Sequence, residues 1–435
     1  MFSLPKIATA PFCPSEVEGS ITIPKHLSFW RKWWLVAGPA LLISVGYMDP
    51  GNWATDIAAG TGFGYQLLSI ILLSNLAAIF LQSLAVRVGI VSGQDLAQLS
   101  RAHFPHAVNI ALWLFAELAI IACDVAEVLG AGLALHLLFG FSLVTGILIT
   151  ILDTALVLGL KGRGFRQVEA IVLALVLTIG ACFAIEMCFA GADWHAVLIN
   201  LVPSMQAVAG KERLFLAIGI VGATVMPHNL YLHSSIVQTR SHAPEATAEA
   251  IRLNLVDTSL ALTLAFFVNA AILILAAAAF HGRHDVTGIS DAYHLLAPAL
   301  GTTAAMIFFG VALLASGQSA TFTGTIAGQI ILEGYLNLKI PCWQRRVITR
   351  ALALVPALTG VIWLGDDGVN RMLVISQVVL GLQLPFVIFP LLRFASSRPL
   401  LDHHRIGPFW QLVGWAVFAV ITAANLWLVY ALLCD

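Results

Sequence analysis

Two short polar segments interrupt long apolar runs in this chain, and both carry groups that can hold a cation. The first segment is Asp49-Pro50-Gly51-Asn52, and the second is Met226-Pro227-His228, preceded by Gly222. Proline and glycine both disfavour a helix interior, so each segment predicts a break in a helix. At mid-depth in lipid, a break is tolerated only where it is buried in protein or lines a cavity. Two kinked packing helices would explain neither the acid nor the thioether, so we expect a polar site at these breaks.

The donor atoms at the two breaks predict a site for a transition metal ion. Unwinding a helix frees backbone carbonyls, here those near Tyr47 and Ala223. With the Asp49 carboxylate and the side-chain oxygen of Asn52, they would suit Na⁺, Ca²⁺ or Mg²⁺. Met226 changes that expectation, because a thioether is a soft ligand that first-row transition metals accept. The alternative for Met226 is a gap-filling apolar side chain. We expect a labile, mixed site that binds Mn²⁺, Fe²⁺ or similar ions.

Ionisable residues inside other apolar runs indicate a route for protons. Because metal ligands must be deprotonated, release of a divalent cation is coupled to protonation of its carboxylate. Asp124 and Glu127 lie on neighbouring turns of one apolar segment, and His228 and His233 follow the second break. Arg350 begins a later apolar run and could balance the acids. Two alternatives stay open: the acids could form a structural ion pair with Arg350, and His233 could serve packing.

Several other polar residues carry weaker signals. Gln377 lies in the middle of a late apolar run, where it could reach the metal in one conformation or form an interhelical hydrogen bond. Asn269 could support the polar network. The small residues of 317–329 are expected to serve close helix packing and gating, not ligation. His403 and His404 are expected in a solvated turn.

The composition is that of a membrane protein with many spans. Hydrophobic residues make up 59% of the chain and charged residues 10%, against about 25% charged residues in a soluble domain. The net charge of −1 gives no basis for binding nucleic acid. None of the six cysteines belongs to a C-x-x-C pair, which argues against a disulfide framework or a zinc site. Residues 1–33 lack a signal-peptide pattern and are expected to form a loosely ordered cytoplasmic tail.

Eleven apolar segments are each long enough to cross a bilayer as a helix. Most of the 22 Lys and Arg residues fall in alternate connections. This positive-inside bias places the N-terminus in the cytoplasm and the C-terminus outside it. The expected spans are 34–58, 66–88, 107–136, 142–160, 167–190, 213–239, 253–280, 302–335, 346–364, 370–393 and 408–433.

The positions of the two breaks predict an internal repeat. They lie in the first and sixth spans, each of which opens a set of five. Because five is odd, the second set is inserted upside down relative to the first, which is the pattern of an inverted repeat with a central site. We therefore expect an all-α polytopic membrane protein with repeats at 34–190 and 213–393 and an additional helix at 408–433.

These residues resemble the Nramp family of divalent metal transporters, most closely its bacterial proton-coupled manganese branch. The resemblance rests on Asp49-Pro50-Gly51-Asn52, on Met226-Pro227-His228-Asn229 and on the stretch 317–334, and it covers roughly 35–430. It implies a LeuT-like fold of two inverted five-helix repeats with helices 1 and 6 unwound. It also implies that the chain imports Mn²⁺ or Fe²⁺ with protons by alternating access, across a bacterial plasma membrane.

The resemblance assigns roles to particular residues. The metal ligands it implies are Asp49, Asn52 and Met226, with backbone groups at Tyr47 and Ala223 and the Gln377 amide in some states. The proton route it implies contains Asp49, His228, Asp124, Glu127 and Arg350. Metal and protons would be cargo in a lipid bilayer, with no resident cofactor, and a single chain is expected to suffice for transport.

Two other classes of function compete with this interpretation. A Na⁺-coupled transporter of organic solutes would present an unwound segment to a substrate carboxylate, which the acid at Asp49 would repel. An intramembrane enzyme would need a motif such as H-E-x-x-H or G-x-S-x-G. Neither motif occurs in the chain, so we do not expect an enzyme.

Overall fold

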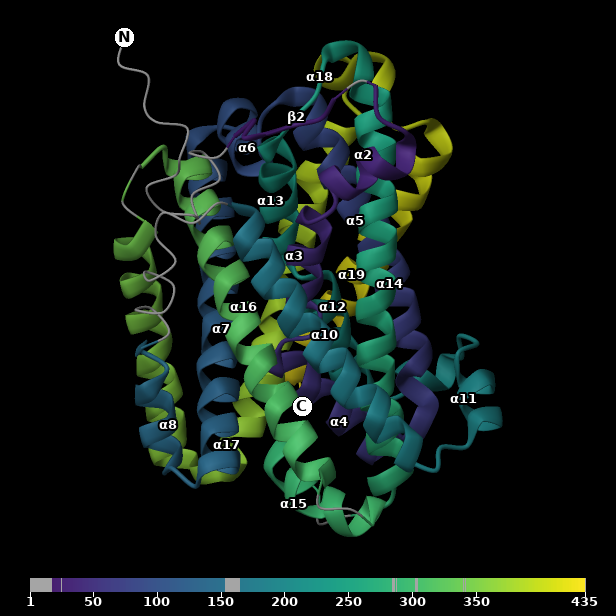
Figure 1. Cartoon of the computed structure of the whole chain (residues 1–435), viewed down its shortest axis with the longest axis vertical. Helices are drawn as coiled ribbons and strands as arrows, with labels where there is room; N and C mark the ends of the chain where they lie inside the picture. The colour runs from purple at the N-terminus through teal and green to yellow at the C-terminus, as the bar shows by residue number, and fades with distance from the viewer. Residues whose placement is uncertain are drawn as a thin grey trace.

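The computed structural model describes residues 18–24, 26–152, 165–283, 286, 288–301, 304–338, 340 and 342–434. They form a bundle of long helices that run between the two ends of the molecule (Figure 1). Within these described residues, nine helical segments are long and apolar enough to cross a membrane. The all-α polytopic class is therefore confirmed, and the number of eleven spans stays a prediction.

Helices account for nearly all of the ordered elements. The long helices are α5 (Leu68–Ser92), α7 (His106–Phe139), α10 (Phe165–Phe189), α14 (Thr247–Phe280), α16 (Ala304–Leu336), α17 (Cys342–Ala395) and α19 (Pro408–Cys434). The shorter ones are α2 (Phe29–Val36), α6 (Leu96–His103), α8 (Leu143–Ile149), α11 (Trp194–Asn200), α15 (Ile289–Leu300) and α18 (Arg398–Leu401). Short 3₁₀ turns occupy Gly64–Leu67, Met205–Val208, Val237–Thr239, Pro244–Ala246 and Asp402–His404. The two strands, β1 (Ile21–Thr22) and β2 (Arg240–Ser241), pair in parallel.

Two spans are each divided into a pair of helices, as their proline and glycine residues predict. The helix α3 (Pro39–Gly46) is followed by α4 (Pro50–Phe63), and α12 (Lys211–Val225) is followed by α13 (Pro227–Ile236). Both α4 and α13 begin with a proline, at the position where its missing N–H would lack an intrahelical partner anyway. The expected unwinding of the first and sixth spans is confirmed.

Some boundaries differ from the expected ones. The described part of the tail contains β1 and the start of α2, so the expectation of a loose tail is wrong there; contacts with distant residues order it. The expected span 142–160 begins with α8, and its residues 153–164 lie outside the described residues. The expected spans 346–364 and 370–393 are joined in α17, which breaks at Gly365, where φ is 66°.

Aromatic packing fixes α4 within the bundle. Trp53 is fully buried, and its ring centroid lies 4.8 Å from that of Phe183 in α10 and 5.1 Å from that of Phe309 in α16. The indole N–H donates a hydrogen bond to the Met48 carbonyl at 3.1 Å. Because a large aromatic side chain dominates the energetics of its surroundings, this packing holds the start of α4 next to the first break.

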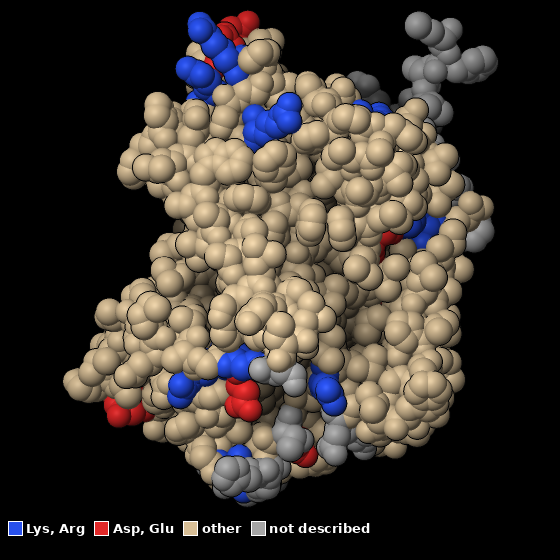
Figure 2. Space-filling view, turned by 180° about the vertical axis from the view of Figure 1, so that it is seen from behind, with Lys and Arg blue, Asp and Glu red and all other residues tan. Residues whose placement is uncertain are grey.

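The distribution of charge agrees with a membrane-spanning bundle. Figure 2 shows Lys, Arg, Asp and Glu side chains gathered near the two ends of the molecule, with most of the face between them uncharged. In lipid a charged side chain is costly unless it faces the protein interior. The uncharged band is therefore the surface that the hydrocarbon core would cover.

One carboxylate outside the spans is almost completely buried. Asp95 caps α6 by accepting the backbone N–H of Gln98 at 2.8 Å, while the Gln98 side chain accepts the N–H of Asp95 at 3.1 Å. The backbone N–H of Leu96 donates to the Ser234 hydroxyl of α13 at 3.0 Å, so α6 is docked on the second broken span. Burial raises the pKa of Asp95 from 3.8 to about 7.

This pKa predicts a specific dependence of stability on pH. Because the folded-state pKa is raised, ionisation of Asp95 opposes folding, and stability falls as pH rises from about 4 to about 7. The shift corresponds to roughly 4 kcal/mol of unfolding free energy. We expect the melting temperature of the detergent-solubilised wild type to fall from pH 5 to pH 8 more than that of Asp95→Asn, which keeps a capping side chain. Equal slopes for the two proteins would contradict the assignment.

Candidate metal site

The first break is organised by the carboxylate of Asp49. Asp49 caps α4, and its Oδ1 accepts the backbone N–H of Asn52 at 2.8 Å and the side-chain amide of Asn52 at 2.7 Å. The other oxygen, Oδ2, is buried and has no hydrogen-bond partner among the described residues. An ionised oxygen left unpaired in a dry interior is costly. The arrangement therefore leaves one acceptor position of Asp49 open for a cation or a proton.

The amide of Asn52 joins the two breaks. Its Nδ2 lies 3.1 Å from the Gly46 carbonyl at the end of α3 and 3.1 Å from the Ala223 carbonyl near the end of α12, in addition to its contact with Asp49. An amide has two hydrogens, so three oxygen acceptors converge on two donors. A cation in the place of this amide nitrogen could be coordinated by all three oxygens at once.

The orientation of that amide decides whether Asn52 itself can bind metal. Its Oδ1 accepts a hydrogen bond from Nδ2 of Asn269 in α14 at 3.3 Å. The oxygen and nitrogen ends of an amide are assigned from such networks. A turn of the amide would bring Oδ1 toward Asp49 and the two carbonyls, which is the orientation a bound cation requires.

Met226 lies at the second break in an unusual backbone conformation. It lies between α12 and α13 and caps both, with φ 42° and ψ 103°. A positive φ is uncommon outside glycine, and strained residues of this kind cluster at functional sites. Its Sδ accepts the Asn229 amide at 3.5 Å and lies 2.8 Å from the position that a Cβ on Gly46 would occupy. The sulfur of the second break therefore lies against the backbone of the first.

Gln377 lies against the first break from α17. Its side-chain amide occupies the space where a Cβ on Gly51 would be. Its Nε2 donates to the Ser376 hydroxyl at 3.0 Å, and its Oε1 is buried with no hydrogen-bond partner in the described part of the chain. Gln377 is thus close to the Asp49 cap and has an oxygen free, while its role as a ligand stays a prediction.

Among the described residues, no three His, Cys, Asp or Glu side chains form a cluster that could hold a metal ion. A site at the breaks must therefore use amide, thioether and carbonyl donors around one carboxylate. Such mixed donors suit an exchangeable transition metal ion better than a structural zinc ion.

Tyr47 and His233 belong to one buried chain of hydrogen bonds. The Gln82 side chain donates to the Tyr47 hydroxyl at 3.3 Å, and its Oε1 lies 3.0 Å from Nδ1 of His233. His233 is therefore a hydrogen-bonded core histidine, which favours the packing interpretation. The backbone of Tyr47 caps α3, but the carbonyl that Asn52 contacts is that of Gly46, which the sequence pattern did not single out.

His228 and the acids of α7 are linked by a residue that sequence reasoning did not include. Sγ of Cys123 lies 3.7 Å from Nε2 of His228 and 3.6 Å from Oε1 of Glu127. Asp124 and Glu127 are 5% and 1% exposed. The structure thus brings His228 and the two acids into one polar cluster.

Arg350 reaches the same cluster through a hydroxyl. The Thr321 hydroxyl donates to Oε2 of Glu127 at 3.3 Å and accepts Nη2 of Arg350 at 3.1 Å. The neighbouring Arg345 pairs instead with Glu117, Nη2 to Oε2 at 2.5 Å. Arg350 is therefore linked to the predicted acid through Thr321, a residue of the small-residue stretch.

That stretch also lets α16 approach the acids closely. A Cβ on Gly324 would lie 2.8 Å from Oε1 of Glu127 and 3.5 Å from Oδ1 of Asp124. Any larger residue would displace the carboxylates. The expected packing role of 317–329 is consistent with this contact. In the expected solvated turn at 403–404, His403 is exposed and its Nδ1 lies 3.1 Å from Oδ2 of its neighbour Asp402.

Comparisons with known proteins agree on a single family. The family model described as natural resistance-associated macrophage protein-like, Nramp, matches residues 40–431. The divalent metal cation transporter MntH of Ralstonia nicotianae is 59% identical over 99% of this chain and 98% of its own length. The crystal structure of the Eremococcus coleocola manganese transporter superposes with a TM-score of 0.88 at 38% identity, over 95% of this chain and 90% of that one.

A more distant structure tests the fold alone. Mhp1, a nucleobase-cation-symport-1 family transporter in a closed conformation, matches with a TM-score of 0.63 at 16% identity. The match covers 99% of this chain and 94% of Mhp1. The expected LeuT-like architecture is confirmed by this likeness and by the closer one.

The contact between the two breaks can be tested with a single methyl group. In Gly46→Ala the new Cβ would press on Met226 Sδ and on the Asn229 amide. We expect Mn²⁺ affinity, measured by isothermal titration calorimetry, to fall roughly tenfold or more, since displaced supporting groups cost 10–100-fold in metal affinity.

Gly62→Ala is the matched control. Gly62 lies in α4, and nothing lies within 4 Å of its added Cβ. We expect this variant to bind Mn²⁺ as the wild type does. Unchanged affinity in a folded Gly46→Ala protein would show that the two breaks do not share one ion.

Proposed function

Because this chain belongs to the Nramp family, we propose that it is a proton-coupled symporter that imports Mn²⁺, Fe²⁺ and similar ions by alternating access. The chain is a divalent metal cation transporter and not an enzyme. The proposal about mechanism rests mainly on one observation: the Asn52 amide and the Met226 sulfur bring donors from two helix breaks together.

The donor set supports selectivity for transition metals. We propose Asp49, Asn52 and Met226 as side-chain ligands, with carbonyls at Gly46 or Tyr47 and at Ala223 and the Gln377 amide in some states. Hard cations such as Ca²⁺ gain nothing from a thioether, whereas Mn²⁺, Fe²⁺ and related ions accept it. A single carboxylate keeps binding weak enough for release. An organic carboxylate substrate would instead be repelled by Asp49.

Proton coupling is supported by the polar chain that begins beside the site. We propose that Asp49 and His228 exchange protons with the cluster of Asp124, Glu127 and Arg350. His233 is assigned a supporting role, because it is hydrogen-bonded to Gln82. Loss of the metal leaves the Asp49 carboxylate without a cation, and protonation would then relieve its buried charge.

Alternating access requires that the site be closed at some stage, and here it is buried. Asp49 and Met226 are 0% exposed and Asn52 is 1% exposed.

On the proposed cytoplasmic side, Arg240 donates to the Val36 and Ala37 carbonyls, each at 3.1 Å, and so holds the link between α2 and α3. We propose that this link must move before an ion can leave to the cytoplasm.

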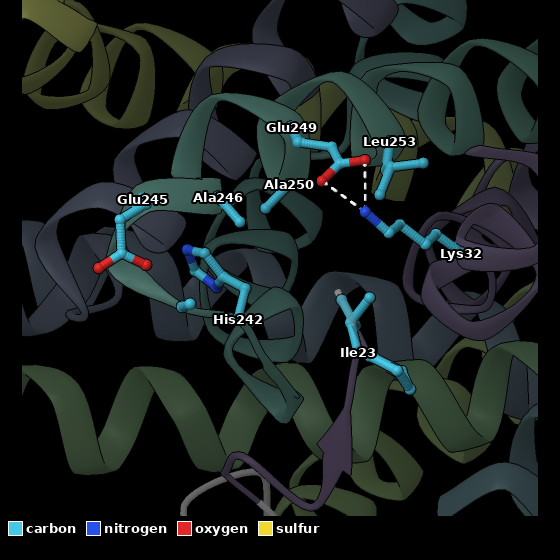
Figure 3. A pocket seen from close by; sticks show the side chains of 10 residues that line it. Ile23, Lys32, His242, Glu245, Ala246, Glu249, Ala250 and Leu253 are labelled. Atoms are coloured by element: carbon cyan, nitrogen blue, oxygen red, sulfur yellow. Dashed lines mark hydrogen bonds and ion pairs between the residues drawn. The ribbon is translucent and has the colours of Figure 1, made fainter. Parts of the chain in front are cut away.

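A second contact holds the same segment. Lys32 of α2 contacts both carboxylate oxygens of Glu249 in α14, each at 2.8 Å, as Figure 3 shows. The pair borders a cavity of about 280 Å³ whose wall also includes Ile23 and His242. Beside it, β1 pairs with β2, and the N–H of Ile23, just after β1, donates to the Ser241 carbonyl at 3.1 Å.

We place the protein in the inner membrane of a bacterium with its N-terminus in the cytoplasm. The charge bias of the connections supports that orientation, and the named relatives are bacterial. We propose one chain as the transporting unit, with metal and protons as cargo and no resident cofactor.

Uptake into proteoliposomes tests the proposal directly. With an inward proton gradient, the wild type is expected to accumulate ⁵⁴Mn²⁺ and to acidify the lumen in proportion. Asp49→Asn keeps the size of the side chain and removes its charge, and we expect uptake to fall by roughly a hundredfold. Glu186→Gln, which changes a buried carboxylate of α10, is the control and should transport normally.

The same assay tests the role of sulfur. Met226→Ala is expected to lose discrimination against Ca²⁺ in competition with Mn²⁺, because only carbonyl, amide and carboxylate oxygens would remain. Uptake that survives in Asp49→Asn, or discrimination unaltered in Met226→Ala, would refute the proposed ligands. Metal uptake without any proton flux would refute coupling but not transport.

Movement of the N-terminal segment can be tested by a reversible cross-link. Thr22 and Ser241 are register partners in the parallel β1–β2 pair, and neighbouring strands lie close enough for a disulfide. Oxidised Thr22→Cys/Ser241→Cys is expected to bind Mn²⁺ and to lose most uptake, with recovery on reduction. Each single variant is the control. Full uptake by the cross-linked protein would show that β1 need not separate from β2.

A further inference from the structure

The helix α2 presents a row of aromatic side chains to the outside of the bundle. Trp30 and Trp34, one turn apart, are 64% and 70% exposed, and Phe29 is 37% exposed. The rings of Phe29, Trp30, Trp33 and Trp34 form a chain of contacts with centroid distances of 5.5, 6.3 and 5.1 Å. Large exposed apolar patches of this kind mark a surface that something else covers.

The opposite side of α2 is fixed to the protein, so the aromatic face cannot turn inward. Lys32 and Val36 are 8% and 0% exposed, and Lys32 is paired with Glu249. Arg166 of α10 donates to the Ala37 carbonyl at 2.6 Å, next to the bonds from Arg240. In Figure 3, Lys32 extends from its helix toward Glu249. The outward direction of Trp30 and Trp34 is therefore built into the fold.

The location of α2 indicates what covers that face. In Figure 1, α2 and α18 lie near the same end of the bundle. Shortly after α18, α19 begins with Phe409 and Trp410, which are 66% and 52% exposed. Tryptophan and tyrosine gather at the two membrane–water interfaces. The aromatic residues of α2 thus continue a belt at this end of the spans.

The charge on α2 favours one kind of lipid. The helix contains Arg31 and Lys32 and no acidic residue. Lys32 forms an ion pair with Glu249, whereas Arg31, which follows Trp30 in the chain, is exposed. A basic side chain near an anionic membrane surface strengthens binding. An aromatic face beside an exposed arginine is complementary to a headgroup layer that contains anionic phospholipid.

We propose that the outer face of α2 is a lipid-binding surface that lies in the headgroup layer of the cytoplasmic leaflet and prefers anionic phospholipid. Because α2 leads through Ala37 and Gly38 into α3, lipid bound there anchors the start of the first broken span. This surface is independent of the metal site and goes beyond the proposed transport function.

Tryptophan quenching by brominated lipids tests the position of α2. The full chain and Trp30→Phe/Trp34→Phe are placed in nanodiscs of phosphatidylcholine and phosphatidylglycerol whose acyl chains carry bromine near the headgroup or near the bilayer centre. The difference between the two emission spectra reports on Trp30 and Trp34. We expect bromine near the headgroup to remove most of the difference emission and bromine near the centre to leave most of it. Trp53→Phe, which changes an enclosed ring, is the control for a tryptophan shielded by protein.

A second experiment tests the preference of α2 for anionic lipid. With bromine only on phosphatidylglycerol or only on phosphatidylcholine, we expect the anionic lipid to be enriched at α2 about fivefold, the ratio that one basic residue near an anionic surface supplies. Arg31→Gln should abolish the enrichment and keep the depth profile. Difference emission that no brominated lipid quenches would overturn the proposal in favour of a protein partner or a second copy of the chain. Stronger quenching from the bilayer centre would overturn the interfacial position, and equal quenching by both lipids would overturn the anionic preference.

Discussion

The architecture depends on how a broken helix satisfies its backbone where no water is available. Each break exposes carbonyls that a continuous helix would have paired, and in lipid every unpaired group is costly. Here the Asn52 amide donates hydrogen bonds to the Gly46 carbonyl of its own span and to the Ala223 carbonyl of the other broken span. One side chain therefore stabilises both breaks and fixes their distance. The same convergence of oxygens makes the place attractive to a cation.

This constraint explains why the polar residues are gathered and not scattered. Asp49 caps α4 and keeps one oxygen unpaired, Met226 holds a strained backbone with its sulfur against Gly46, and Gln377 fills the space beside Gly51. Each feature costs stability alone, and strain of this kind persists only where the surroundings enforce it. At the start of α4, the buried packing of Trp53 against Phe183 and Phe309 supplies such support. Stability and the capacity to bind an ion thus compete at the same atoms.

The sequence predicted the breaks because proline and glycine act locally. Asp49-Pro50-Gly51-Asn52 and Met226-Pro227 mark the ends of α3, α4, α12 and α13 with little dependence on the rest of the chain. The Gly46 carbonyl, the Cys123 thiol between His228 and Glu127, and Thr321 before Arg350 were missed, because their roles arise only from contacts across the bundle. The strand β1 was missed because two residues carry no periodic signal. The orientation in the membrane, inferred from charge, and the number of eleven spans, inferred from apolar runs, stay predictions.

The proposed mechanism requires that one ion bind between the two breaks. Crystals of the full chain soaked in Mn²⁺ and measured at the manganese absorption edge would locate the ion by its anomalous scattering. We expect a single strong peak bounded by Asp49, Asn52, Met226 and the Ala223 carbonyl, with the Asn52 amide turned to present its oxygen. A peak elsewhere in the bundle, or a Mn²⁺ ion that contacts only one of the two breaks, would contradict it.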